Sequence, residues 1–303
     1  MAAWSQLSSD ISQAVEQTGK SIVTVGGRGR PRSGIILDES TVVTAAHAIQ
    51  EEENIRVWIS PETPLRASLK GRDSATDIAV VATETKIPEA VGRPAQFNEN
   101  PQLSVGQLVV SVARTWRGNV VASSGILSGL MGEWHTAHGR RVDAFIRPDL
   151  LLYRGFSGGA LIGADRKIIG MITAFLRRGS PLAVPYATIR RITAVLVEKG
   201  YIPRPYLGLG LQPVRVPESL KQKLNLSENA GALVVHVEPA GPADQGGVLV
   251  GDILLTIGEG RFGEERTTAI LSRLSPGQSA NVRAIRGGQL SSCQLNVGER
   301  RNR

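Results

Sequence analysis

Short β-rich runs recur through the first two thirds of the chain and limit the folds that are open to it. Each run holds β-branched or aliphatic residues and is separated from the next by polar, Gly-rich or Pro-rich residues. The runs lie at residues 21–25, 34–37, 41–45, 55–59, 78–82, 108–112, 120–128, 144–146, 160–162 and 168–174. Many short strands at this spacing predict an all-β barrel or sandwich.

Helical patterns flank this β-rich region and help to bound it. Residues 1–20 form a predicted N-terminal helical segment, and residues 186–199 form a second helix that ends at Gly200. The two prolines within residues 200–205 break regular structure and predict a linker. We therefore expect a β-rich domain at residues 21–200.

A smaller second domain is predicted at residues 206–298. Its expected strands lie at residues 232–237, 253–257, 282–285 and 290–295. A helix is expected at residues 264–274, where apolar side chains share one face before Pro276 and Gly277 stop it.

A serine among glycines is the central chemical signal of the first domain. Ser157 lies within Gly155-Phe156-Ser157-Gly158-Gly159, between two apolar runs. Glycine permits backbone conformations that a side chain forbids, and it lets a substrate carbonyl approach main-chain N–H groups, as an oxyanion hole requires. Taken alone, the motif fits an ordinary Ser-Gly turn better than a catalytic serine.

The residues upstream supply the partners that a nucleophilic serine needs. Serine requires a neighbouring base, usually a histidine oriented by a carboxylate. His47 follows a buried strand, and Asp77 opens another apolar strand 30 residues later. Asp73 is the rival carboxylate, but its polar surroundings predict that it is solvated. The order His, Asp, Ser is that of the chymotrypsin-like triad, although His47 by itself also fits a structural histidine.

Residues 44–47, 77–81 and 155–161 together resemble the three signature stretches of the HtrA family of trypsin-like serine proteases. Residues 33–37 and 124–128 resemble strands of the same family. The resemblance covers roughly residues 21–199. It implies a mainly β fold, a chymotrypsin/trypsin-like double six-stranded β-barrel.

The resemblance also implies roles for particular residues. His47 would take the Ser157 proton and later protonate the leaving amine, and Asp77 would hold the histidine tautomer. The N–H groups of Gly155 and Ser157 would form the oxyanion hole. The α/β-hydrolase alternative, with its Gly-x-Ser-x-Gly elbow, is rejected because that fold needs its acid and histidine after the serine, and only His236 follows.

Two positions depart from the family pattern. Phe156 stands where the family usually has Asn, and a bulky ring could cover the cleft or change the order of the loop. Residues 114–118 replace the family's Gly-Asn-Pro-Phe-Gly turn, so the packing of that loop is in doubt. Phe156 motivates the alternative function, a catalytically incompetent peptide-binding or chaperone-like scaffold of the same fold.

The residues before the serine indicate specificity. In trypsin-like enzymes the residue six before the serine lines the pocket for the side chain ahead of the scissile bond. That residue is Leu151, with Leu152 and Ala183 expected nearby. An apolar pocket predicts cleavage after small or medium aliphatic residues. The other interpretation is that residues 150–152 are core and that the pocket is set elsewhere.

The second domain resembles the PDZ domain that follows HtrA proteases. Tyr206, Leu207, Gly208 and Leu209 would form the loop that binds a peptide carboxylate, and the helix at residues 264–274 would form the other wall of the groove. A small barrel without ligand binding is the other interpretation. Together the two domains predict a serine endopeptidase that degrades unfolded or exposed polypeptides and recognises apolar C-termini, a role in protein quality control.

Composition narrows the partners. The net charge of +8 is scattered and aromatic residues make up only 4%, so nucleic-acid binding is not predicted as the main role. Cys293 is the only cysteine, which excludes an internal disulfide. His135 and His138 lack a third ligand, so we expect an exposed loop there, no metal and no cofactor. That loop resembles the family's regulatory loop.

Location and assembly are predicted from the N-terminal residues. No basic cap followed by an apolar run opens the chain, and no run of eighteen apolar residues occurs. The default expectation is a cytoplasmic location, or a periplasmic one if a signal segment precedes these residues. The N-terminal helix resembles the segment through which family members form homotrimers, with Trp4 and Leu7 as contacts.

Overall fold

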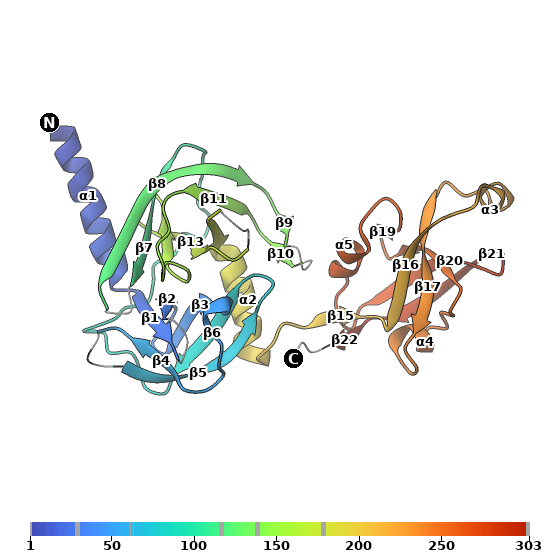
Figure 1. Ribbon diagram of the computed structural model, residues 1–303, viewed down its shortest axis with the longest axis horizontal. Coiled ribbons are helices and arrows are strands. Elements are labelled where there is room, and N and C mark those ends of the chain that lie inside the picture. The colour runs from blue at the N-terminus through green and yellow to red at the C-terminus, as the bar shows by residue number, and fades with distance from the viewer. Residues whose placement is uncertain are drawn as a thin grey trace. The chain divides into compact units, whose positions relative to one another are not determined.

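The computed structural model describes residues 2–27, 31–60, 62, 64–114, 118–136, 140–176 and 180–300 (Figure 1). It divides into two compact units, Met1–Ile202 and Pro203–Arg303. The domain limits expected from the sequence, at residues 21–200 and 206–298, remain predictions at the level of single residues.

The first unit contains two closed barrels within its described residues. The first barrel runs in the order β1-β2-β3-β6-β5-β4 and the second in the order β11-β14-β13-β12-β7-β8. The first barrel consists of β1 (Ile22–Gly26), β2 (Arg32–Ile36), β3 (Thr41–Ala45), β4 (Ile55–Trp58), β5 (Pro64–Asp73) and β6 (Ile78–Thr83). The second consists of β7 (Leu108–Arg114), β8 (Val120–Met131), β11 (Phe145–Asp149), β12 (Ala160–Ile162), β13 (Ile168–Thr173) and β14 (Leu182–Pro185). The predicted double barrel is confirmed.

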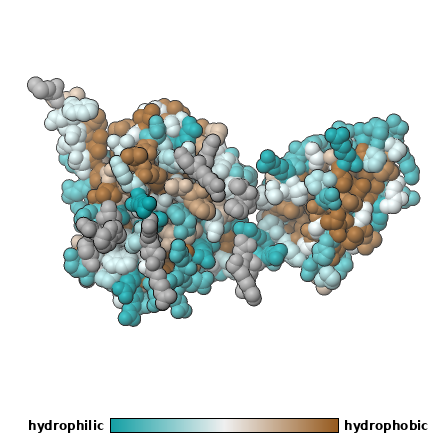
Figure 2. All heavy atoms as spheres, in the orientation of Figure 1, coloured by the Kyte–Doolittle hydropathy of each residue, from teal (hydrophilic) through white to brown (hydrophobic). Residues whose placement is uncertain are grey.

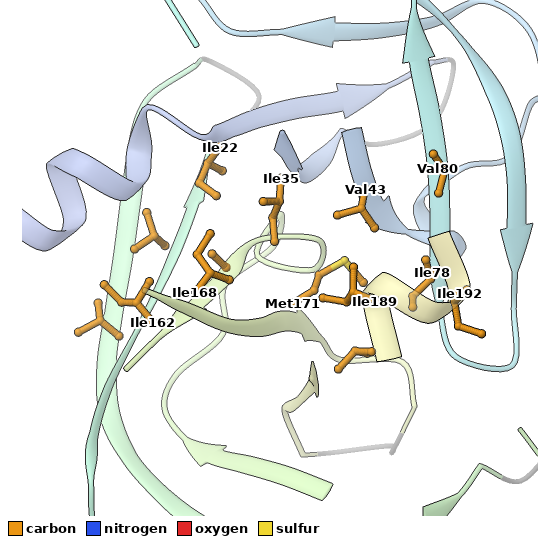
Figure 3. Packing of buried hydrophobic residues seen from close by; sticks show 14 of the residues in the cluster. Ile22, Ile35, Val43, Ile78, Val80, Ile162, Ile168, Met171, Ile189 and Ile192 are labelled. Carbon is orange, nitrogen blue, oxygen red and sulfur yellow. The ribbon is translucent and has the colours of Figure 1, made fainter. Parts of the chain in front are cut away.

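A shared hydrophobic core joins the two barrels. Buried side chains from β1, β2, β3 and β6 pack in one cluster with side chains from β7, β12, β13 and β14 (Figure 3). Ile189 and Ile192 add the apolar face of α2 (Tyr186–Lys199), the helix predicted from the sequence. Gly200 ends α2 with a φ of 78°, a left-handed conformation that glycine adopts without steric cost. The seam between the barrels is therefore a packed interior.

The N-terminal helix α1 (Ala2–Gly19) is buried only near its C-terminal end. Ala14, Thr18 and Gly19 are buried, whereas Trp4 is 77% exposed and Leu7 is 41% exposed. The strand β8 also exposes apolar side chains, and Figure 2 shows apolar surface around it. No helix in the described part of the chain is long and apolar enough to cross a membrane.

The second unit is an open, mainly antiparallel sheet with short helices. Its sheet runs in the order β16-β17-β18-β20-β21, and β19 pairs with β18. The strands are β15 (Arg204–Tyr206), β16 (Leu209–Arg215), β17 (Ala230–Val237), β18 (Ile253–Ile257), β19 (Gly260–Arg261), β20 (Ser279–Arg286), β21 (Gln289–Asn296) and β22 (Gly298–Arg300). The helices are α3 (Glu218–Leu224), α4 (Pro242–Gln245) and α5 (Thr267–Ser272).

The second unit differs from the sequence prediction in one helix and in several elements that were not predicted. The helix expected at residues 264–274 is the shorter α5, because Arg266 before it is extended and Arg273 caps its end. The elements not predicted are β15, β16, β19, β22, α3 and α4, and β16 contains Pro213. Proline cannot donate a ladder hydrogen bond and is tolerated on edge strands, and β16 lies at the edge of the sheet.

Candidate active site

Strand pairing brings His47 and Asp77 together. His47 lies in η1 (Ala46–Ala48), directly after β3, and Asp77 directly precedes β6, its antiparallel neighbour. The Nδ1 atom of His47 is 2.9 Å from both carboxylate oxygens of Asp77. The His47 backbone N–H donates to Asp77 Oδ1 at 2.9 Å. Asp77 is fully buried and its carboxylate holds the imidazole at two points.

Thr173 is a further partner of this pair that sequence reasoning missed. Its hydroxyl donates to Asp77 Oδ2 at 2.5 Å and accepts a hydrogen bond from the Phe175 N–H. Thr173 is fully buried at the end of β13, in the second barrel. The only available signal was a polar residue at the end of an apolar strand.

Ser157 lies in a loop of unusual backbone shape. The Phe156 N–H donates to the Tyr153 carbonyl at 3.2 Å, and Gly155 has a φ of 101°. This is a β-turn with a positive φ at its third position, which requires glycine. Gly158 has a φ of 86°, and a Cβ there would lie 2.0 Å from the Ser33 carbonyl oxygen. The glycines around Ser157 are therefore required by the loop.

Three successive residues connect the members of the predicted triad. Thr173 binds Asp77, the Ala174 N–H donates to Ser157 Oγ at 3.4 Å, and the Phe175 ring stacks on His47 at 5.4 Å between centroids. Within the described residues, the Ser157 hydroxyl makes no hydrogen bond to His47. The structure thus brings all three side chains to one short segment, with Ser157 bound to a main-chain donor.

Two main-chain donors flank Ser157. Neither the Gly155 N–H nor the Ser157 N–H donates a hydrogen bond to any described part of the chain. Unpaired backbone donors are uncommon in a buried environment, and Ser157 is only 7% exposed. These donors can bind an oxygen of a ligand.

Phe156 lies inside the protein. It is 2% exposed, and its ring contacts that of Tyr153 at 5.9 Å between centroids. The expectation that this ring could cover the cleft is therefore wrong. The ring instead fills space beneath the loop.

Asp73 is also placed differently from the prediction. It is 4% exposed rather than solvated. Thr76 Oγ1 donates to it at 2.8 Å, and Arg140 Nε lies 3.3 Å away. Asp73 is thus a structural carboxylate with its own cation.

Arg114 packs the segment whose arrangement was in doubt. Its guanidinium donates to the carbonyls of Gly19, Ile22, Ile59 and Gly118 at 2.6–3.0 Å. Burial lowers the pKa of Arg114 below its usual value. Residues 115–117 lie outside the described residues.

The expected pocket residues are not all in one place. Leu152 packs on the core of the second barrel, in the same cluster as Ala183, which is 3% exposed. Leu151 is 62% exposed and is not part of that cluster. His135 is exposed in β9 (Trp134–His135), which pairs with β10 (Arg141–Val142), and His138 lies outside the described residues.

The loop predicted to bind carboxylate leads into an edge strand. Gly208 has a φ of 72°, and its carbonyl accepts from the Glu238 N–H at 2.8 Å. The N–H groups of Leu207 and Gly208 donate to nothing in the described residues. Leu209 follows at the start of β16, and Tyr206 lies under Arg300. The loop therefore offers two donors beside an open strand.

These features define a trypsin-like peptidase domain joined to a PDZ domain. The trypsin-like peptidase domain family matches residues 32–171, and the PDZ domain family matches residues 205–297. Together they support an HtrA-type protease with a PDZ domain.

Relatives and solved structures agree with this placement. A probable periplasmic serine endoprotease DegP-like of Rhizobium meliloti is 28% identical over 90% of this chain and 54% of its own length. A protein of the same name from Rickettsia conorii is 30% identical over 80% of this chain and 47% of its own length. The chain spans about half the length of the curated relatives it matches.

The structural neighbours extend over nearly the whole chain. The serine endoprotease from Yersinia pestis is 25% identical, with a TM-score of 0.70, over 95% of this chain and 97% of its own. The HtrA-type protease AlgW with decapeptide has a TM-score of 0.71 at 22% identity, over 96% and 99% of the two chains. This second likeness concerns the fold.

Proposed function

We propose that the chain is a serine endopeptidase in which His47, Asp77 and Ser157 form the catalytic triad. The observation that carries this proposal is that one short segment contacts all three side chains. Thr173 binds Asp77, the Ala174 N–H binds Ser157, and the Phe175 ring stacks on His47. With Asp77 on its Nδ1, His47 has the other ring nitrogen free to accept the Ser157 proton. Movement of Ser157 Oγ from the Ala174 N–H to the His47 ring would complete that step.

The N–H groups of Gly155 and Ser157 are proposed as the oxyanion hole. Attack by Ser157 on a peptide carbonyl places negative charge on its oxygen, which the two donors would stabilise. The imidazolium then protonates the leaving amine, and water repeats the sequence in reverse. Neither donor has an acceptor among the residues that the structure describes, which supports this role.

The decisive test compares wild-type protein with Ser157→Ala on a fluorogenic peptide and on casein. Loss of the nucleophile is expected to lower kcat on the order of 10⁶-fold. Equal rates would end the peptidase proposal and leave the peptide-binding scaffold. The scaffold alternative was motivated by Phe156, and the burial of that ring removes its motive.

The proposed substrates are unfolded or exposed polypeptides cleaved after small or medium aliphatic residues. Leu152 and Ala183 are the residues that best support an apolar pocket, because both lie in one apolar cluster. Leu151, at 62% exposure, would contribute only if the bound substrate covers it. Profiling cleavage sites in a denatured protein tests this specificity.

The PDZ unit is proposed to bind apolar C-terminal peptides. The N–H groups of Leu207 and Gly208, which have no acceptor in the described part of the chain, would hold the carboxylate, with Tyr206 and Leu209 flanking them. The peptide would then pair with the open edge of β16. The AlgW structures with a decapeptide and a tripeptide are those of similar proteins. Recruitment of exposed C-termini fits a role in protein quality control.

A periplasmic location and a homotrimer complete the proposal. The curated relatives are named periplasmic, and none of those named supports the default expectation of a cytoplasmic location. Trp4 and Leu7 are exposed on α1 and supply apolar surface for a trimer contact. Light scattering that finds a monomer at micromolar concentration would reject the trimer.

A further inference from the structure

Ser33 connects the two barrels beside the proposed oxyanion hole. It belongs to β2 in the first barrel and is fully buried. Its hydroxyl donates to the Gly155 carbonyl at 2.8 Å and accepts a hydrogen bond from the Arg114 N–H at 2.9 Å. The Arg114 carbonyl is more distant, at 3.3 Å. One buried hydroxyl therefore binds both the loop of Ser157 and strand β7.

The main chain of Ser33 holds the same loop on both sides of Ser157. Its N–H donates to the Gly155 carbonyl at 3.1 Å, so that carbonyl receives two hydrogen bonds from one residue. Its own carbonyl accepts from Thr44 Oγ1 at 2.7 Å and lies against the α-carbon of Gly158. Ser33 thus contacts the loop at Gly155, before the nucleophile, and at Gly158, after it.

The orientation of the Gly155 N–H depends on the contact of Ser33 with the Gly155 carbonyl. In a turn with a positive φ at its third position, the central peptide is turned over relative to the common type I turn. Here that peptide joins Arg154 to Gly155, so the choice of turn sets the direction of the Gly155 N–H. Fixing the Gly155 carbonyl fixes one end of Gly155 and opposes the change of turn.

We propose that Ser33 is a positioning residue for the peptidase reaction. Its hydroxyl and N–H clamp the Gly155 carbonyl and keep the Gly155 N–H directed at the substrate oxygen. The clamp acts on the transition state more than on the bound substrate, because charge on that oxygen appears only as the reaction proceeds. The inference rests on the proposed function of this same site.

The test compares Ser33→Ala with Ser111→Ala. Ser111 is a matched control: it is fully buried in β7, and its hydroxyl has no partner in the described residues. With a fluorogenic peptide, Ser33→Ala is expected to lower kcat about tenfold, the effect of about one hydrogen bond, and to leave KM within about twofold. Ser111→Ala is expected to keep both constants.

Two further measurements distinguish positioning from loss of structure. A peptide aldehyde forms a hemiacetal whose oxygen occupies the oxyanion hole, so its inhibition constant should rise by the same factor as kcat falls. The midpoint of the pH profile of kcat/KM should not move, because the triad keeps its contacts. A wild-type kcat, or a loss that lies wholly in KM, overturns the role of Ser33.

A conservative variant covers failure to fold. Ser33→Cys keeps a weak donor at the same position, and its kcat should lie between those of wild type and Ser33→Ala with KM unchanged; a loss that lies wholly in KM would overturn the proposal. Wild-type protein without Ser157-dependent hydrolysis would instead end the proposed function itself. Active wild type together with full-rate Ser33→Ala rejects only the inference about Ser33.

Discussion

The two units offer their proposed sites in opposite ways. In the first unit both sheets close into barrels, and the proposed triad comes from segments at the ends of strands. In the second unit the sheet is open, with β16 at its edge. A closed sheet has no edge to pair with, whereas an open edge accepts the backbone of another chain. Chemistry and peptide capture should therefore be separable by mutation.

Among the variants that compare the two units, Asp77→Asn is expected to have the largest effect, a loss of catalysis in the first unit. An amide cannot hold the His47 tautomer, so kcat should fall on the order of 10⁴-fold. The affinity of the second unit for an apolar C-terminal peptide should not change. Fluorogenic peptide hydrolysis and fluorescence anisotropy measure the two effects.

The control for this variant is Asp73→Asn. Asp73, the last residue of β5, is also a buried carboxylate, but its partners are Thr76 and Arg140. We expect its kcat to stay within about tenfold of wild type, since the contacts that are weakened, those to Thr76 and Arg140, do not include His47. Equal losses in the two variants would contradict the assignment of Asp77.

Gly208→Val should weaken peptide binding by the second unit. A β-branched residue is strained at the Gly208 φ of 72°, and its Cβ would lie 3.1 Å from the Glu238 Cβ. Peptide affinity is expected to fall at least tenfold, or about 1.4 kcal/mol, while hydrolysis of a short peptide is unchanged. Gly287→Val is the control, because Gly287 is also left-handed but has open space around it.

A variant of Asp252 tests whether the second unit can unfold while the first stays folded. Arg286 Nε and Nη2 lie 2.8 and 2.7 Å from its carboxylate oxygens, and the Leu249 N–H donates to it. Burial would raise the pKa of Asp252, but the hydrogen bonds from Arg286 and Leu249 and the Arg286 charge hold it below its usual value. Asp252→Asn should destabilise this unit by about 2 kcal/mol.

The same carboxylate predicts a pH dependence. Because the pKa of Asp252 is lower in the folded state, its stabilisation is complete above the unfolded-state value, near 4. The stabilisation is lost as pH falls through the lower folded-state value. Hydrogen exchange of residues 203–300 should show this loss in wild type and not in Asp252→Asn. Equal acid sensitivity in the two proteins would contradict it.

The sequence was sufficient for features that have a local signature. Strand spacing predicted a β-barrel or sandwich, the resemblance to the HtrA family implied the double barrel, and the helix at residues 186–199 was confirmed. The glycines beside Ser157 correctly indicated special backbone, since Gly155 and Gly158 both have positive φ. The signals for the single strands, the helix and the glycines each lie within a few neighbouring residues.

The rest depends on contacts between distant parts of the chain. Thr173 reaches Asp77 across 96 positions and Ser33 reaches Gly155 across 122, so no local pattern reveals either contact. The burial of Asp73 depends on Arg140, which comes from the other barrel's portion of the chain. Leu151 shows the same limit, because its distance from the serine says nothing of its 62% exposure.

Phe175→Ala is expected to have the smallest effect. It tests how strongly the Ser157 side chain is restrained in the absence of substrate. The Phe175 ring is 51% exposed and lies nearly parallel to the His47 ring, at 13°. We expect this stack to help keep the neighbouring Ala174 N–H on Ser157 Oγ, 3.4 Å away. Removal of a contact worth about 0.5–1.5 kcal/mol should release Ser157 toward His47 and raise kcat/KM about threefold on a short peptide.

Phe175→Leu separates stacking from bulk. Leucine keeps apolar volume over His47 but cannot stack, so it should give the same rise as alanine if the stack restrains Ser157. A rise with alanine alone would mean that bulk over the imidazole, rather than the stack, is what limits substrate approach. A fall in kcat with both variants would contradict the restraint and would mean that the Phe175 ring orients His47 for proton transfer.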